Sequence, residues 1–378
     1  MILKHIRAHK SALFVLASLI AFGVPSPVRA ESPPVVRLIH SFTAPDGNRV
    51  TTYPEFPTAK FGPDGRTVLC AVGRRLTLWN LKPLRVLKSL DLQTRATEID
   101  ITADGQFVAT TGVLPSGDRQ LTVWRLQGWK AVKRITFPSS HTCGTPSFAP
   151  DCRQIAVPCP RRSTGNDQYD IQLFSLPEWR RVATLSSEEE VSPEHVAWSH
   201  DGRFVAATSF YGDAGVGTLS VWRVRDRKRT YHFDGWGDYF EDISEGPLGF
   251  VGKTHMLVCG ADWFNVDSRR PRISNVVRTG RGHNLHSVAL CGKDNNLILL
   301  DRIVDTRIDN RLDDPYTVWD PVRRKPLWSF RSKVKHASTY ASLSPDAAFL
   351  VAVTETGGDS NPGFILNLFA LPDRKHIR

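Results

Sequence analysis

The side chains of this sequence that could carry chemistry are scattered histidines and aspartates. His283 and His286, within GHNLH, have the imidazole nitrogens that ligate transition metals. Four aspartates between residues 303 and 315 have the carboxylate oxygens that calcium prefers, but their spacing fits no calcium loop and two arginines lie among them. We therefore expect a solvated loop there and no metal site. The four are Asp305, Asp309, Asp313 and Asp314.

The motifs that mark common enzyme sites are absent from the sequence. It has no GxSxG elbow, no HExxH zinc motif, no Walker loop and no GxGxxG between a strand and a helix. We therefore expect no catalytic residue and no cofactor, and we predict that the chain is not an enzyme.

The cysteines have neither CxxC nor zinc spacing. Cys143 and Cys159 flank a predicted hairpin whose turn is residues 150–153, so we expect them to approach each other and form a disulfide. Such a bridge would constrain one sheet without a redox role. Cys259 and Cys291 are a second candidate pair.

Residues 1–30 have the three parts of a secretory signal peptide. Three basic residues precede an apolar run over 12–24, and Val28 and Ala30 occupy the positions that a signal peptidase reads. The alternative is a membrane anchor, but the run is shorter than the roughly 20 residues that a span requires. We predict cleavage, a mature chain of residues 31–378, and a periplasmic or extracellular location.

The formal net charge is +11, and the basic residues are scattered along the chain. A scattered distribution is not the footprint of a nucleic-acid-binding protein. No second apolar run is long enough to cross a bilayer. We therefore expect a protein or cell-envelope partner, no nucleic acid, and no transmembrane span after signal cleavage.

A strand-like run that ends in an aromatic residue recurs along the chain, first as LTLWNL at 76–81. Successive aromatic residues lie 45, 50, 48, 97 and 50 positions apart, so one copy is missing from the longest interval. We expect that copy near residue 270, at RISNVV (272–277), with Val276 in the aromatic position. The six aromatic positions are Trp79, Trp124, Phe174, Trp222, Trp319 and Phe369.

A short acidic turn repeats in step with the aromatic run. It appears as PDGR at 63–66 and later as ADGQ, PDCR, HDGR, GKDN and PDAA, with a degenerate copy near Gly252. Asp and Gly favour tight turns, and a strand-like run lies on each side of every copy. With a further run after the aromatic one, each period of roughly 40–50 residues contains four strands, which is typical of a propeller blade.

These repeats predict an all-β fold, a seven-bladed β-propeller of four-stranded antiparallel blades over residues 31–378. Only a short tail, 372–378, follows the last aromatic run, so the last blade lacks its fourth strand. Residues 36–42, VRLIHSF, are similar to the fourth strands of other blades. We expect them to complete the last blade and close the ring, which would remove two open sheet edges.

The repeats resemble the WD-repeat (WD40-like) propeller family over residues 36–378, as an exported bacterial type with degenerate repeats. Gly282-His283 and Trp319-Asp320 match the two dipeptides that mark the family. The resemblance implies structural roles for His283, Asp320 and the six aromatic positions, and an incomplete His–Asp–Ser/Thr–Trp network in most blades. The turns are also similar to those of TolB-like periplasmic propellers, which is the nearby alternative.

Aromatic residues gather in the loops of the fourth and fifth repeats, notably in FDGWGDYFEDISEG at 233–246. We expect them to reach one rim, where exposed aromatic clusters mark interaction sites. The other interpretation is that they pack onto the ring or fill its channel. The seven are Phe210, Tyr211, Trp236, Tyr239, Phe240, Trp263 and Phe264.

The predicted function is an exported propeller that acts as a rigid protein-interaction or scaffold platform and binds through rim loops. The alternative is a propeller enzyme, a lactonase-like hydrolase or cofactor-dependent oxidoreductase, with its site in the central funnel. Four residues near the starts of inner strands keep that alternative open: Glu194, His195, His283 and His336.

Overall fold

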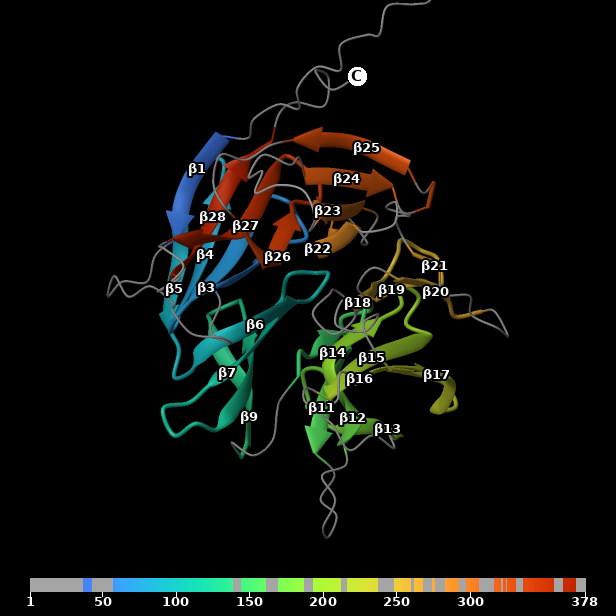
Figure 1. The fold of residues 1–378 in the computed structure, drawn as a ribbon. Helices are drawn as coiled ribbons and strands as arrows, with labels where there is room; N and C mark the ends of the chain where they lie inside the picture. The colour runs from blue at the N-terminus through green and yellow to red at the C-terminus, as the bar shows by residue number, and fades with distance from the viewer. Residues whose placement is uncertain are drawn as a thin grey trace, which may run out of the picture. The chain divides into compact units, whose positions relative to one another are not determined.

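The structure, a computed structural model, is built from β-strands throughout the residues that it describes (Figure 1). These residues contain no helix that could cross a membrane. The described residues are 37–42, 57–138, 144–160, 169–186, 193–211, 216–236, 248–259, 262–267, 274–275, 283–291, 297–305, 316–320, 322–323, 325–330, 336–356 and 363–371.

The strands form seven four-stranded antiparallel sheets within the described part of the chain, six of them made of four consecutive strands. The first two contain β2 (Thr58–Phe61), β3 (Thr67–Val72), β4 (Arg75–Leu81), β5 (Leu84–Asp91), and β6 (Arg95–Ile101), β7 (Phe107–Val113), β8 (Arg119–Arg125), β9 (Lys130–Phe137). The third contains β10 (Ser147–Phe148), β11 (Gln154–Pro160), β12 (Tyr169–Ser175) and β13 (Arg181–Ser186). The fourth contains β14 (Pro193–Trp198), β15 (Phe204–Tyr211), β16 (Val216–Arg223) and β17 (Lys228–Trp236).

The fifth sheet contains β18 (Leu248–Phe250), β19 (Met256–Cys259), β20 (Asp262–Asn265) and β21 (Ser274–Asn275). The sixth contains β22 (His283–Cys291), β23 (Leu297–Asp305), β24 (Tyr316–Asp320) and β25 (Lys325–Phe330). The all-β class and the four-stranded antiparallel sheets predicted from the repeats are therefore confirmed.

The remaining sheet joins the two ends of the described chain. It contains β26 (His336–Leu343), β27 (Phe349–Thr356), β28 (Gly363–Ala370) and β1 (Arg37–Phe42). Strand β1 runs antiparallel to β28, with Arg37 opposite Ala370 and Phe42 opposite Leu366 (Figure 1). This is the pairing expected for residues 36–42.

Neighbouring sheets share hydrophobic clusters. In one cluster, Phe42 and Leu368 of the sheet that contains β1 pack with Phe61 and Val68 of the first sheet. Four further clusters join the first sheet to the second, the second to the third, the third to the fourth and the fourth to the fifth. Another joins the sixth sheet to the sheet that contains β1. Burial of apolar surface therefore holds together the neighbouring sheets that these clusters join.

The acidic turns have one repeated hydrogen-bond pattern. The Asp carboxylate accepts a hydrogen bond, 2.9–3.1 Å long, from the backbone N–H two residues later. In a tight turn this backbone N–H has no partner in a neighbouring strand, and the aspartate carboxylate provides one. The aspartates are Asp64, Asp104, Asp151, Asp201 and Asp346.

Three of these turns contain a buried hydroxyl, from Thr102, Ser199 or Ser344. Each hydroxyl donates a 2.6 Å hydrogen bond to the turn aspartate. Each also accepts a bond of 2.9–3.0 Å from the N–H of the phenylalanine that begins the next strand. The hydroxyl thus satisfies groups that water does not reach.

Successive turns pack against each other through a proline and a residue with positive φ. The backbone φ angles of Gly105 and Gly202 are 68° and 69°. A Cβ at Gly105 would lie 3.5 Å from Pro63, and one at Gly202 would lie 3.8 Å from Pro150. The turns of these neighbouring sheets therefore lie side by side.

The expected position of the degenerate repeat was wrong. The third strand of the fifth sheet is β20, and Ser274 and Asn275 belong to the fourth strand, β21. Phe264 pairs with Leu257, the second residue of its neighbouring strand, as Trp222 pairs with Val205 in the fourth sheet. Phe264, not Val276, therefore holds the aromatic position. The third strand comes earlier than expected, because only two residues, 260 and 261, connect β19 to β20.

We predict that Ser344→Ala lowers the free energy of unfolding by about 2 kcal/mol, because the Phe349 N–H loses its buried acceptor. Urea unfolding followed by circular dichroism measures the change. The exposed Ser186, at the end of β13, provides the matched control, and Ser186→Ala should change stability by less than about 0.5 kcal/mol. Equal effects of the two substitutions would contradict the role of the turn hydroxyl.

Candidate functional site

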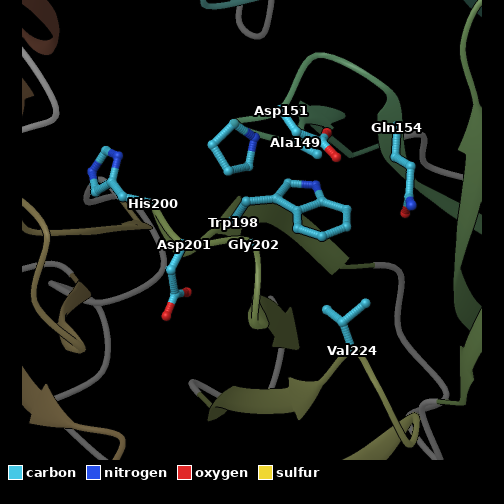
Figure 2. Close-up of a pocket in the computed structure, with 9 residues that line it drawn as sticks. Ala149, Asp151, Gln154, Trp198, His200, Asp201, Gly202 and Val224 are labelled. Carbon is cyan, nitrogen blue, oxygen red and sulfur yellow. The ribbon is translucent and has the colours of Figure 1, made fainter.

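A groove of about 340 Å³ lies between the turns of the third and fourth sheets (Figure 2). One side comes from the turn that joins β10 to β11, and the other from the turn that joins β14 to β15. The lining residues are Ala149, Pro150, Asp151, Gln154, Trp198, His200, Asp201, Gly202 and Val224.

Trp198 is the central side chain of the groove. It ends β14, is 8% exposed and belongs to the hydrophobic cluster between the third and fourth sheets. Its indole Nε1 donates a 3.0 Å hydrogen bond to the Ser147 carbonyl of the neighbouring sheet. In Figure 2 the indole lies between the side chains of Asp151 and Val224. The ring is therefore fixed by packing and by a hydrogen bond across the sheets.

His200 connects the groove to the fifth sheet. Its Nε2 lies 3.2 Å from the carbonyl oxygen of Phe250. Because a carbonyl oxygen can only accept a hydrogen bond, Nε2 carries the proton. The imidazole thus joins the fourth-sheet turn to the end of β18.

Asp201 links the groove to a second histidine, His255. The imidazole of His255 lies between two carboxylates, with its Nε2 bonded to Asp201 and its Nδ1 to Asp267. Partial burial lowers the pKa of His255, but the two aspartates outweigh this effect and the net pKa is raised. Burial opposes ionisation of Asp201 too, yet bonds from the Ser199 hydroxyl, the Arg203 N–H and His255 lower its pKa to about 2.

Charged side chains also gather on the first strands of the first two sheets. Lys60 on β2 and Asp100 on β6 form a 3.3 Å ion pair, and Asp100 accepts a 2.8 Å bond from the Phe148 N–H on β10. Burial raises the pKa of Glu98 on β6 to about 7, Lys60 lowers it and Asp100 adds to the rise. The sequence did not single out these residues, because Lys60 comes from a different repeat than Glu98 and Asp100.

Two of the inner-strand residues predicted from the sequence lie on β14. Burial lowers the pKa of His195 to about 4, so its imidazole is neutral near pH 7. The Thr145 hydroxyl lies 3.4 Å from its Nδ1, and the Glu194 carbonyl accepts a bond from the Thr145 N–H. His283 and His336 begin β22 and β26.

The prediction that Phe264 reaches a rim is wrong. Its side chain is 0% exposed and lies in the cluster between the fourth and fifth sheets, near the rings of Tyr231 and Phe233. The physical reason is that β20 is a core strand and not a loop. The position of Phe264, two residues after the start of a short hairpin strand, was the sequence signal that could have predicted its burial.

Four other predicted aromatics lie on strands. Phe210 and Tyr211 end β15, Trp236 ends β17, and Trp263 lies on β20. Val216 pairs with Tyr211 on one side and with Trp236 on the other, so these two share one row of the fourth sheet. That row is at the opposite end of β15 from the groove. Tyr239 and Phe240 lie outside the described residues.

The aromatic repeat positions lie in the sheet interiors. Trp124, Trp222 and Phe369 are buried, and Trp79 and Phe174 are half-buried. Trp124 Nε1 donates a 3.1 Å bond to Thr110, which is the Thr–Trp part of the network that the resemblance implies. In the sixth repeat, Trp319 is half-buried. Asp320, which follows it, accepts hydrogen bonds from Arg323.

The predicted disulfide stays a prediction. Cys159 lies buried on β11, opposite Asp170, whereas Cys143 lies outside the described residues. His286 lies on β22. Asp309, Asp313 and Asp314, like Cys143, lie outside the described residues. Among described residues, no group of three His, Cys, Asp or Glu side chains is arranged to hold a metal ion.

Comparison with solved structures places this arrangement among WD40-like folds. The chain is similar to Kuenenia stuttgartiensis hydrazine synthase, with 14% identity and a TM-score of 0.57 over 81% of this chain and 94% of that one. It is similar to U3-55K, with 13% identity and a TM-score of 0.56 over 90% of this chain and 100% of that one. The WD40 repeats of RRP9 give 13% identity and a TM-score of 0.57 over 90% and 99%.

The chain therefore has a WD40-like fold built from antiparallel sheets, as the repeats predicted. At these identities the similarity establishes the fold alone. A scan against family models found no match, and a search of curated proteins found no similar sequence.

We predict that the bonds of His255 make stability depend on pH. Because the pKa of His255 is raised in the folded protein, its bonds contribute their full stabilisation below the pKa of the unfolded chain, about 6.5. This stabilisation is lost as the pH rises through the pKa of the folded protein. His255→Gln should lower the free energy of unfolding by about 1 kcal/mol near pH 5.5 and by less near pH 9. Urea unfolding at the two pH values measures both differences.

A His255→Gln deficit that stayed constant or grew with rising pH would contradict the role of the charged imidazole.

Proposed function

We propose that this chain is an exported, degenerate WD-repeat propeller with seven blades, closed by β1, that serves as a rigid protein-interaction platform. Export rests on the signal-peptide pattern of residues 1–30. The ring rests on the β1–β28 pairing and on the hydrophobic clusters between successive sheets. The platform role rests on a binding surface held by rigid elements.

The observation that carries the proposal is the groove between the turns of the third and fourth sheets. Its walls are tight turns whose aspartates bond their own backbone, and its central Trp198 is fixed across two sheets. A preformed surface of this kind loses little conformational entropy when a partner binds. The groove therefore suits recognition of an exposed segment of another protein.

A second binding face is proposed at the opposite ends of the strands. Phe210, Tyr211, Trp236 and Trp263 come from neighbouring fourth and fifth sheets. Large aromatic side chains contribute much of the energy of protein interfaces. This face and the groove are alternative sites for the same platform function.

An enzyme is the second candidate function. Glu98 favours it, because a carboxyl with a pKa of about 7 suits proton transfer near neutral pH. Its charged neighbours, Lys60 and Asp100, are already paired with each other. We place the enzyme second because one such carboxyl does not make a catalytic constellation.

The platform is tested by crosslinking in cells that export the tagged chain, followed by mass spectrometry and affinity measurement with each purified partner. Gln154→Trp fills the groove with a bulky ring, whereas Trp236→Ala alters the opposite face. We expect Gln154→Trp to weaken binding by about tenfold and Trp236→Ala by less than about twofold. Thermal unfolding checks that both variants fold.

Other outcomes of this experiment have defined meanings. Loss of binding only with Trp236→Ala would move the interface to the aromatic face. Absence of any crosslinked protein would contradict the platform function. Retention of the chain in the cytoplasm would contradict export.

A further inference from the structure

We propose that the groove binds an arginine side chain of the partner protein. The inference rests on the proposed platform function and goes further by naming the chemical group that is recognised. It follows from three properties of the groove: a carboxylate with an available oxygen, an amide oxygen without a donor, and an aromatic ring at the centre.

The available carboxylate is that of Asp151. Its Oδ1 accepts the Arg153 N–H at 2.9 Å, and among described residues no group donates to Oδ2. Asp201, the other carboxylate in the lining, is already bonded to Ser199, to the Arg203 N–H and to His255. The groove therefore offers negative charge mainly at Asp151.

The amide oxygen is Oε1 of Gln154. It is shielded from water and receives no hydrogen bond from the described part of the chain. Asp151 and Gln154 lie at the two ends of the same tight turn, and both line the groove (Figure 2). A buried acceptor without a donor is unfavourable, so a donor in the groove would be stabilised once the Gln154 amide turned its oxygen from the shielded position toward it.

Trp198 supplies the aromatic contact for a cation. It is 8% exposed, and the exposed part of its indole lines the groove, where a cation would be attracted to the ring. The nearby guanidinium of Arg203 is not available for this contact, because it lies over the Phe204 ring and 3.8 Å from Asp201. The site for an external cation is therefore left open.

Arginine fits these three properties better than lysine. A planar guanidinium can stack on an indole while its several N–H groups donate to two different acceptors. A lysine ammonium is a compact charge on a flexible stem and does not stack in this way. A volume of about 340 Å³ accommodates one such side chain.

The test uses the whole mature protein and a blocked peptide, acetyl-Gly-Arg-Gly-amide, as the probe. Isothermal titration calorimetry measures its affinity beside two matched peptides, in which lysine or the uncharged isostere citrulline replaces arginine. We expect dissociation constants in the millimolar range for arginine and about tenfold weaker binding of citrulline. Lysine should fall between them. Equal affinity of arginine and citrulline would overturn the proposal.

Asp151→Asn locates the binding within the molecule. Asparagine keeps the oxygen that accepts the Arg153 N–H and removes only the charge, so the turn should survive. We expect about fivefold weaker binding of the arginine peptide. The matched control is Asp64→Asn, at the same turn position of the first sheet, which should leave the affinity unchanged. Equal affinities of Asp151→Asn and the unmodified protein would overturn the site.

A spectroscopic readout covers the case in which the calorimetric signal is small. In protein labelled with 5-fluorotryptophan, the arginine peptide should shift the ¹⁹F resonance of Trp198, which Trp198→Phe identifies. A shift confined to other tryptophans would overturn the proposal. Partners captured in cells alongside failure of the arginine peptide would leave the platform function intact and remove only this inference.

Discussion

Hydrophobic packing between neighbouring sheets is the interaction on which the rest of this structure depends. A single four-stranded sheet cannot bury its own apolar face, so each one is stable only against its neighbours. The clusters that connect successive sheets, such as that of Phe42, Phe61 and Leu368, supply this burial. An array of such sheets leaves two exposed ends unless its first and last members meet, and the pairing of β1 with β28 brings the chain ends into one sheet.

The groove is a consequence of this packing. Because the sheets are held side by side, the turn at Pro150 meets the turn at Gly202, and Trp198 is fixed between them. The turns need no packing from the groove itself, since their aspartates already satisfy the backbone. The exposed carboxylate of Asp151 is therefore available for contacts with another molecule.

The repeats could be predicted from the sequence, whereas the groove could not. Trp124 and Trp222 mark third strands because an aromatic residue at that position packs between sheets, and the acidic turns signal themselves through Asp and Gly. Phe264 was misplaced because an interval of 97 residues was divided evenly, whereas the fifth sheet has a two-residue hairpin connection. The groove could not be predicted, since Asp151 and Trp198 belong to different repeats and only packing between sheets brings them together.

The central proposal is that strand β1 closes the array by pairing with β28, and a disulfide between the two strands tests it directly. Arg37 and Ala370 are opposite each other, so cysteines at both positions lie within the separation that a disulfide spans. The account predicts that R37C/A370C crosslinks on oxidation and that the oxidised protein unfolds in one transition at higher urea concentration than the reduced protein. Failure to crosslink, or a crosslink that leaves the midpoint unchanged, would contradict it.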